Sequence, residues 1–241
     1  FQNSRGSFEG MSQDFVKELA KDIEKKYNVS LTIAKQEVTG QTRQILVTSG
    51  AIDIEGGSTT ATEARSKIVN FSILDADPVI LSTLATTKNI NTLEDLMGKR
   101  IAVVAGTTAE TIIKKLNAEK AWSTTVIGVK DYPAGFALLE QGRVDGVSTN
   151  GVLMAGEIAK LGDKFKLQPQ VIVGPAELIG VMFGKDDAEF TALVQGTMAR
   201  MKADGSLEKL YAKWFSQPIP GIGNLNMRWT PAQKKLVFES K

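Results

Sequence analysis

The sequence contains neither cysteine nor histidine among its 241 residues. Their absence excludes thiolate and imidazole metal sites, and it excludes the Ser-His-Asp and Cys-His designs of nucleophilic catalysis. No disulfide can form, which fits an oxidising compartment but is common elsewhere, so it decides little about location. We expect no metal and no cofactor.

Long apolar runs and an excess of charge of one sign are missing as well. No run approaches the ~20 apolar residues that span a bilayer, and no secretory signal is recognisable. Lysine and arginine number 29 against 27 aspartate and glutamate, a net charge of +2. Nucleic-acid binders usually concentrate basic residues on one surface, whereas this chain has only short pairs such as Lys25-Lys26 and Lys234-Lys235. We expect no nucleic-acid partner, and the start at Phe1 suggests a processed or trimmed chain.

The N-terminal part of the chain predicts a helix followed by a β-α-β step. Ser12 is a suitable N-cap, and Phe15, Leu19 and Ile23 repeat every four residues along one helix face. After this helix, which ends at Tyr27, apolar residues alternate with polar ones in a way typical of strands. The expected elements are a strand at 29–33, a short helix at 41–46 and a strand at 51–54.

A second series of strands and helices begins near residue 78. Thr92 with Asp95, and Thr107 with Glu110, match the capping box that opens a helix. Extended crossings are expected at 78–85 and 177–183, strands at 101–105, 126–129, 144–149 and 171–173, and helices after 92, 107, 133, 152, 186, 206 and 230. The composition is globular, and the length fits either one large domain or two small ones. We therefore predict an α/β fold of two lobes, with residues 1–82 plus 182–241 in lobe one and residues 83–181 in lobe two.

The segment Gly56-Gly57-Ser58-Thr59-Thr60 follows the expected strand at 51–54 and precedes Arg65. Glycine lets a ligand approach the main chain closely, and the hydroxyl groups are short hydrogen-bond donors. A guanidinium group matches the two oxygens of a carboxylate. The segment therefore predicts a carboxylate receptor, with a polar turn and a surface arginine as the alternative.

Several segments occur in a characteristic order along the chain. They are Gly57–Thr60 with Arg65 and Phe71-Ser72, Thr92–Val103, Gly106–Thr108, Leu139–Gly146 and Trp214-Phe215. Together they resemble the amino-acid-binding proteins of bacterial ABC importers, which are family 3 solute-binding proteins. The C-terminal stretch from Pro218 to Asn226 looks most like the aspartate/glutamate-binding branch, and the resemblance covers essentially the whole chain.

This resemblance implies a two-lobed type II periplasmic-binding-protein-like fold, joined by two hinge strands, that closes on one ligand. It implies a monomer that is periplasmic, or tethered outside the membrane, and that delivers a small carboxylate to a membrane permease. Ser58, Thr60 and Arg65 match positions that hold the ligand α-carboxylate. Arg43 matches an arginine for the side-chain carboxylate, and Thr107 or Thr108 matches the contribution of lobe two.

The chain departs from the family pattern at positions that concern the ligand. The resemblance places Phe1 just after the family's first strand, so we expect a ligand-facing residue of that strand, and a possible second side-chain arginine, to lie outside the sequence printed above. Asn150 stands where the family usually has an aspartate for the ligand ammonium, Tyr132 where the acidic branch has a histidine, and Gly40 where it has a serine. A neutral Asn150 predicts a ligand that lacks an α-ammonium group or binds it more weakly.

Each candidate also has a purely structural interpretation. Arg65 fits a helix face in water, and the expected capping box explains Thr107. Asn150 fits a turn at the end of a strand, and Tyr132 fits a packed aromatic residue. These alternatives remain open from the sequence alone.

Other function classes remain open as well. An enzyme on the same scaffold, similar to cyclohexadienyl dehydratase, needs a general acid in a desolvated cleft, for which Glu177 is the one candidate. The ligand-sensing module of a receptor and an engineered, trimmed scaffold are the further alternatives.

Overall fold

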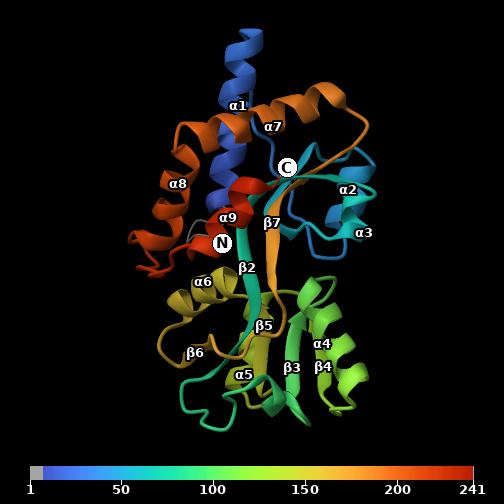
Figure 1. Cartoon of the computed structure of the whole chain (residues 1–241), viewed down its shortest axis with the longest axis vertical. Helices are drawn as coiled ribbons and strands as arrows, with labels where there is room; N and C mark the ends of the chain where they lie inside the picture. Colours follow the sequence, from blue (N-terminus) through green and yellow to red (C-terminus); the bar gives the residue numbers. More distant parts are fainter. Residues whose placement is uncertain (1–7, 241) are drawn as a thin grey trace. The chain divides into compact units, whose positions relative to one another are not determined.

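The computed structural model describes residues 8–240, which form two compact units. Unit 1 contains the described residues up to Val38, Thr42–Ala76 and the described residues from Leu178 onward. Unit 2 contains Thr39–Gln41 and Asp77–Glu177. The chain passes between the units inside β2 (Asn70–Leu84) and near the start of β7 (Ala176–Phe183), so each of these two strands belongs to both units (Figure 1).

These crossings lie at 76/77 and 177/178. The sequence-based boundaries, 82/83 and 181/182, lie a few residues further along the same two strands. The short segment Thr39–Gln41 groups with unit 2, although the residues on both sides of it group with unit 1.

Unit 1 has a small antiparallel sheet covered by helices. Strand β1 pairs antiparallel with β7, and β7 is also next to β2 in the strand order. Helices accompany this sheet in unit 1, and most of them bury apolar side chains in its cores. They are α1 (Met11–Tyr27), α2 (Arg43–Thr48), α3 (Glu63–Ser66), α7 (Ala188–Ala203), α8 (Ser206–Tyr211) with a π-helical turn at Ala212–Ser216, and α9 (Pro231–Glu239); β1 is Ile54–Thr60.

The core of unit 1 follows from the predicted helix periodicity. Phe15 and Leu19 of α1 are fully buried against Phe183 of β7 and Met198 of α7. Burying one such side chain stabilises the fold by about 1.5–3 kcal/mol. Ile54, the first residue of β1, packs against the same core.

Unit 2 is built around three parallel strands, with β3 between β4 and β5. The second half of β2 pairs antiparallel with β5 and β6. The elements are a 3₁₀ turn at Leu93–Leu96, β3 (Arg100–Val104), α4 (Thr108–Lys120), β4 (Thr125–Val129), α5 (Tyr132–Glu140), β5 (Gly146–Asn150), α6 (Gly151–Leu161) and β6 (Phe165–Gln168).

The two faces of this sheet carry separate cores. Ile101 and Val103 point to one face and pack with Ile113 of α4, whereas Ala102 points to the other and packs with Phe136 of α5. Successive residues of a strand point to opposite faces, so a continuous apolar run indicates a strand covered on both sides. The parallel β/α part of the prediction is confirmed here.

The strand expected at 29–33 does not form. Val29, Leu31 and Ile33 are between 40% and 48% exposed, and no strand within residues 8–240 pairs with this segment. A strand needs a neighbour to satisfy its backbone groups, and alternation alone does not supply one. The β-α-β step predicted for this part of the chain is therefore wrong, and β1 is antiparallel to its neighbour β7.

The strand expected at 171–173 is also wrong. Val171 and Val173 are buried, and the Val173 amide donates to the Val79 carbonyl, but the segment is irregular. The strand in this region is β6, which pairs with β2. The alternation of apolar residues at 171 and 173 therefore reflects buried side chains and not the pairing of a strand.

Candidate functional site

The glycine- and hydroxyl-rich segment of unit 1 is itself a strand. Residues 56–60 form most of β1, whereas residues 51–53 form a bend. The pairing with β7 shifts register between Glu55 and Thr59, because the chain bulges there. The prediction of a strand at 51–54 ending in a loop is therefore wrong, and the half-buried Ser58 lies within the bulge.

The absence of a side chain at Gly57 makes room for the Glu55 carboxylate. A Cβ atom at Gly57 would lie 2.0 Å from Glu55 Oε1. Glu55 is only 5% exposed, so its carboxylate folds back onto its own strand. Gly57 thus permits a close approach between a buried carboxylate and the main chain.

Arg43 and Glu55 are connected through Thr59. Arg43 Nη1 donates to Thr59 Oγ1 at 2.7 Å, and Thr59 Oγ1 donates to Glu55 Oε2 at 2.6 Å. Arg43 Nε is buried and has no hydrogen-bond partner among residues 8–240. A buried donor without a partner costs about 1–3 kcal/mol, which makes this nitrogen a candidate for contact with an anion.

Arg65, in α3, is anchored to the next residue of the same strand. Thr62 caps α3 by accepting a hydrogen bond from the Arg65 amide, and Arg65 Nη1 donates to the Thr60 carbonyl at 2.9 Å. The two guanidinium groups therefore bond to adjacent residues, Thr59 and Thr60, at the end of β1. The structure brings together all four unit 1 candidates in this short region: Arg43, Ser58, Thr60 and Arg65.

Glu55 sets the charge balance of this region. Burial raises the pKa of the Glu55 carboxyl, and Arg43, the Thr59 hydroxyl group and Arg65 each oppose that rise. The charges of two guanidinium groups thus favour the ionised form of one buried carboxyl group. When Glu55 is ionised, the cluster keeps a net positive charge for a bound anion.

The start of α4 in unit 2 differs from the predicted capping box. Thr107 Oγ1 donates to the Val104 carbonyl at 2.7 Å, and Glu110 Oε2 accepts from the Gly106 amide at 2.9 Å. Thr107 is still the N-cap residue, but its side chain makes no cap hydrogen bond. The capping box is therefore wrong, because the glutamate reaches the turn one residue before the N-cap and the threonine hydroxyl is turned toward the strand.

Thr108 and Asn150 meet at Glu177. Thr108 Oγ1 donates to Glu177 Oε2 at 2.8 Å, and Asn150 Nδ2 donates to the same oxygen at 3.1 Å. Asn150 Nδ2 also donates to the Asp77 carbonyl at 3.0 Å. A carboxylate therefore lies within one hydrogen bond of the neutral Asn150.

Tyr132 joins the same part of unit 2. Its hydroxyl group and Thr149 Oγ1 are 3.0 Å apart, and Thr149 precedes Asn150 in β5. Tyr132 is the first residue of α5, whose N-cap is Asp131. Thr108 and Asn150 are thus linked through Glu177, Tyr132 bonds to the residue before Asn150, and Thr107 precedes Thr108 in sequence.

The glycine at position 40 has a steric explanation. A Cβ atom at Gly40 would lie 2.5 Å from the Ala105 carbonyl oxygen, and one at Gly106 would lie 2.7 Å from the Gly40 oxygen. The segment Thr39–Gln41 therefore runs directly against the turn that precedes α4. A serine does not fit at position 40 in this arrangement.

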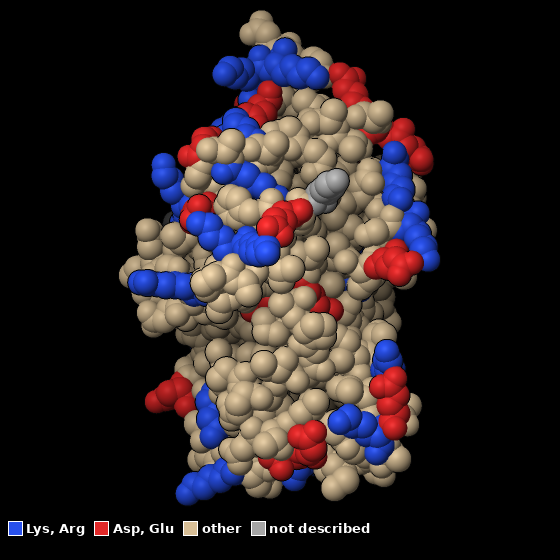
Figure 2. All heavy atoms as spheres, viewed as in Figure 1, with Lys and Arg blue, Asp and Glu red and all other residues tan. Residues whose placement is uncertain are grey.

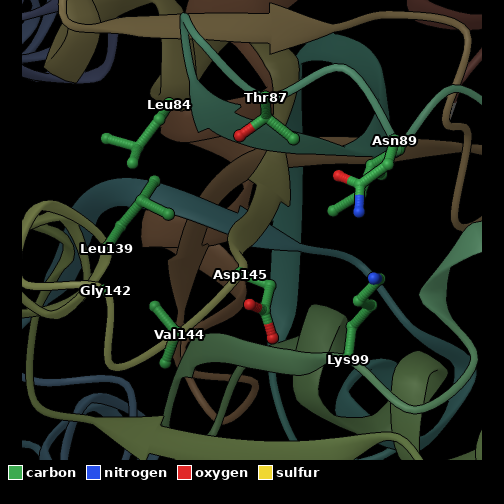
Figure 3. Close-up of a pocket in the computed structure, with 9 residues that line it drawn as sticks. Leu84, Thr87, Asn89, Lys99, Leu139, Gly142, Val144 and Asp145 are labelled. Carbon is green, nitrogen blue, oxygen red and sulfur yellow. The ribbon is translucent and has the colours of Figure 1, made fainter.

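A separate cavity of about 150 Å³ lies elsewhere in unit 2. Figure 3 shows its polar lining from Thr87, Asn89, Lys99 and Asp145. None of the eight candidate residues lines it, and Asp145 is held by Arg100 through paired hydrogen bonds. This cavity therefore adds nothing to the candidate site.

Three further features bear on the function class. Within residues 8–240, no group of three or more acidic residues is placed to hold a metal ion. None of the described helices is both long enough and apolar enough to cross a membrane. Lysine and arginine side chains are interspersed with acidic ones over the face seen in Figure 2, with no continuous basic surface.

Two relatives found by comparison with known proteins carry names of the same kind. The L-glutamate/L-aspartate-binding protein of Pseudomonas aeruginosa is 37% identical over 236 residues, which are 95% of this chain and 76% of that protein. The glutamate/aspartate import solute-binding protein of Escherichia coli K12 is 36% identical over 226 residues, 91% of this chain and 73% of that protein. Both names denote binding proteins.

Solved structures show the same fold. An ancestral arginine-binding protein bound to arginine matches with a TM-score of 0.78 at 26% identity, over 89% of this chain and 92% of that chain. The two-lobed type II periplasmic-binding fold is therefore confirmed. The named relatives are solute-binding proteins, as is the family whose model matches, which supports a solute-binding protein over the enzyme alternative. The match to the family extends over residues 1–217, and the chain therefore belongs to the bacterial extracellular solute-binding proteins, family 3.

Proposed function

We propose that the chain captures an acidic amino acid, L-glutamate or L-aspartate, or a related dicarboxylate, and delivers it to the permease of an ABC importer. It acts as a monomer in the periplasm, or tethered on the outer side of the membrane. The 37% and 36% identical relatives, whose names specify glutamate and aspartate, support this ligand class.

The observation that carries the proposal is the pair of arginines at the end of β1. Arg43 and Arg65 bond to the adjacent residues Thr59 and Thr60, so two guanidinium groups are available in one small region. Two fixed cations favour a ligand with two carboxylates, because each guanidinium fork matches one carboxylate. Arg65, with Ser58 and Thr60, would hold the α-carboxylate, and Arg43 would hold the side-chain carboxylate.

Units 1 and 2 would act as the two ligand-binding lobes. Unit 2 would contribute Thr107 and Thr108 at the start of α4, where backbone amides and the helix dipole favour an anion. Asn150 and Tyr132 would complete the contacts. Each charge-assisted hydrogen bond contributes about 1.5–3 kcal/mol, so four or five of them, after ordering costs, reach the ~8 kcal/mol of a micromolar ligand.

Isothermal titration with a panel of amino acids tests the proposal. The purified chain, freed of co-purified ligand, is titrated with L-glutamate, L-aspartate, L-glutamine and L-arginine. We expect dissociation constants of about 1 μM or lower for the acidic pair and weaker binding of the other two. Mass spectrometry of the molecule that co-purifies provides an independent identification. Preferential binding of glutamine or arginine would overturn the proposal.

A second ligand class is favoured by Asn150 alone. A neutral residue at this position favours a dicarboxylate without an α-ammonium group, such as 2-oxoglutarate. Titration with L-glutamate and 2-oxoglutarate side by side separates the two classes. A preference for L-glutamate by orders of magnitude would exclude the deaminated ligand.

A further inference from the structure

We propose that Glu55 is a positioning residue: through Thr59 it holds Arg43, and it takes up a proton when a dicarboxylate ligand binds. This inference rests on the proposed function, since it assumes that a ligand carboxylate binds each of the two arginines, Arg43 and Arg65. It gives a role to a buried carboxyl group that is not itself a candidate ligand contact.

A short chain of hydrogen bonds joins Glu55 to Arg43. Thr59 Oγ1 lies 2.6 Å from Glu55 Oε2 and 2.7 Å from Arg43 Nη1. A guanidinium nitrogen can only donate, so the Thr59 oxygen must accept from Arg43, and the hydrogen of the hydroxyl group is free to go to the Glu55 carboxylate. The ionised Glu55 therefore orients the Thr59 hydroxyl group for Arg43.

The same arrangement leaves part of Arg43 for a ligand. Within residues 8–240, Arg43 Nε is buried and has no hydrogen-bond partner, whereas Nη1 is held by Thr59. The guanidinium plane is thus fixed at one corner, and another of its nitrogens remains open to an anion. A cation that is held in place before binding loses less conformational entropy when the ligand arrives.

The charged groups that act most strongly on Glu55 are Arg43 of α2 and Arg65 of α3. Strand β7 places the neutral Met182 opposite Glu55 in register. Helix α1 contributes the neutral Gln13, whose amide donates at 2.7 Å to the carbonyl of the residue that follows Glu55. Apart from burial, the protonation of Glu55 therefore responds mainly to the two arginines.

Ligand binding changes what the arginines do to Glu55. Burial raises the pKa of the Glu55 carboxyl, and both arginines oppose that rise. An arginine that is neutralised by a ligand carboxylate opposes it less, so binding raises this pKa further. Two cations and one anion are present before binding, and two ligand carboxylates bring the anions to three. A proton from the solvent that joins a Glu55 oxygen restores the balance.

A purely structural role for Glu55 predicts a different result. If the carboxyl group only shaped the bulge of β1, ligand binding would take up no proton at this site. Proton uptake predicts instead that the affinity for L-glutamate rises as the pH falls, because protonation removes the anion that competes for the arginines. The affinity changes by up to about tenfold for each unit by which the ligand raises the pKa of Glu55.

Calorimetry on wild type measures the proton uptake directly and needs no variant. L-Glutamate is titrated at about pH 6, where both of its carboxylates are ionised, in buffers that differ in their enthalpy of ionisation. The dependence of the binding enthalpy on that quantity gives the number of protons exchanged. We expect a net uptake of up to about one proton per ligand, and a higher affinity at about pH 6 than at about pH 8.

The variant Glu55→Gln assigns the proton to this residue. Glutamine has nearly the same size and keeps an oxygen for the Thr59 hydroxyl group, but it does not titrate. We expect it to bind L-glutamate without proton uptake, with an affinity that is nearly independent of pH and exceeds that of wild type at about pH 8. Asp75→Asn, which neutralises another buried carboxyl of unit 1 with a raised pKa, is the matched control and should retain the uptake.

The variant Thr59→Val tests the connection to Arg43. Valine has the shape of threonine but no hydroxyl group, so Arg43 loses its anchor while its charge and that of Glu55 remain. We expect the affinity for L-glutamate to fall about tenfold. An unchanged affinity would overturn the positioning of Arg43 through Thr59.

The outcomes separate this inference from the proposed function. No proton exchange or a net release in wild type, or an uptake that persists in Glu55→Gln, would overturn the role of Glu55. The proposed function would stand in those cases, provided that wild type still binds L-glutamate. Failure of wild type to bind L-glutamate, L-aspartate and related dicarboxylates would overturn the proposed function, and this inference with it.

Discussion

Two arginines and one buried glutamate dominate the chemistry of unit 1 at the scale of single residues. Arg43 reaches Glu55 through Thr59, and the charges of both arginines act on Glu55. Burial alone would favour a protonated Glu55, and the arginines oppose this. An anionic ligand would compete with Glu55 for the same two arginines. Binding of such a ligand would therefore change the protonation of the buried Glu55 carboxyl.

Replacement of Arg65 by glutamine should weaken ligand binding selectively. Glutamine retains a donor but loses the charge and the fork of the guanidinium group, so we expect the affinity for L-glutamate to fall about 10- to 100-fold by calorimetry. Arg228→Gln removes an exposed arginine from the same unit and should leave the affinity unchanged. An unchanged affinity in the Arg65 variant would show that Arg65 does not contact the ligand.

Asp75 should make unit 1 less stable as the pH rises. Burial raises the pKa of Asp75 from 3.8 to about 6, although Trp229 Nε1 and the Ala76 amide donate to its carboxyl. The folded state therefore binds this proton more tightly than the unfolded state. Its contribution to stability falls as the pH rises from about 4 to about 6 and is constant above that, a loss of about 3 kcal/mol.

The comparison with Asp75→Asn isolates this contribution. Asparagine keeps an oxygen that accepts from Trp229 but does not titrate. We expect the stability of the variant relative to wild type, measured by urea unfolding, to increase between pH 4 and pH 7. A constant difference over this range would contradict the raised pKa.

The bulged strand β1 is the element that positions the unit 1 candidates. Its register against β7 shifts between Glu55 and Thr59, and the two glycines lie within that interval. The shift decides which residues at the end of β1 face Arg43 and Arg65. A change in the bulge should therefore affect the binding of both carboxylates.

Gly57→Ala tests the importance of this bulge. The new Cβ atom would lie 2.0 Å from Glu55 Oε1, so the buried carboxylate must move. We expect a stability loss of about 1–3 kcal/mol together with weaker L-glutamate binding, measured by thermal unfolding and calorimetry. Gly196→Ala in α7, where a Cβ atom meets nothing within 4 Å, should instead be neutral or stabilising by up to about 1 kcal/mol. Full affinity in Gly57→Ala would argue against a role for the Glu55 position in binding.

The whole molecule consists of two units that share strands β2 and β7. A ligand that binds only the folded chain stabilises it by about 2.7 kcal/mol at one hundred times its dissociation constant. For a chain of this length each kcal/mol corresponds to about 2–4 °C. We therefore expect L-glutamate to raise the melting temperature by roughly 5–10 °C in scanning calorimetry, and L-arginine to raise it much less. The reverse order would point to a basic ligand.

Local patterns in the sequence determined the helices and the buried strands. The spacing of Phe15 and Leu19 predicts α1, and Pro133 and the apolar run 101–105 predict the elements of unit 2. The capping box of Thr92 and Asp95 forms as expected. These predictions succeed because helix periodicity, capping and two-sided burial depend on residues close together in the chain.

Only the tertiary structure decided which segments pair and which side chains meet. Residues 29–33 have the alternation of a strand but no neighbouring strand, and β1 gained its bulge from its pairing with β7. Glu177 lies 69 residues from Thr108 and 27 from Asn150 along the chain, yet it bonds to both. Hydrogen bonds between distant segments depend on how the sheet is assembled, and no local spacing in the sequence encodes them.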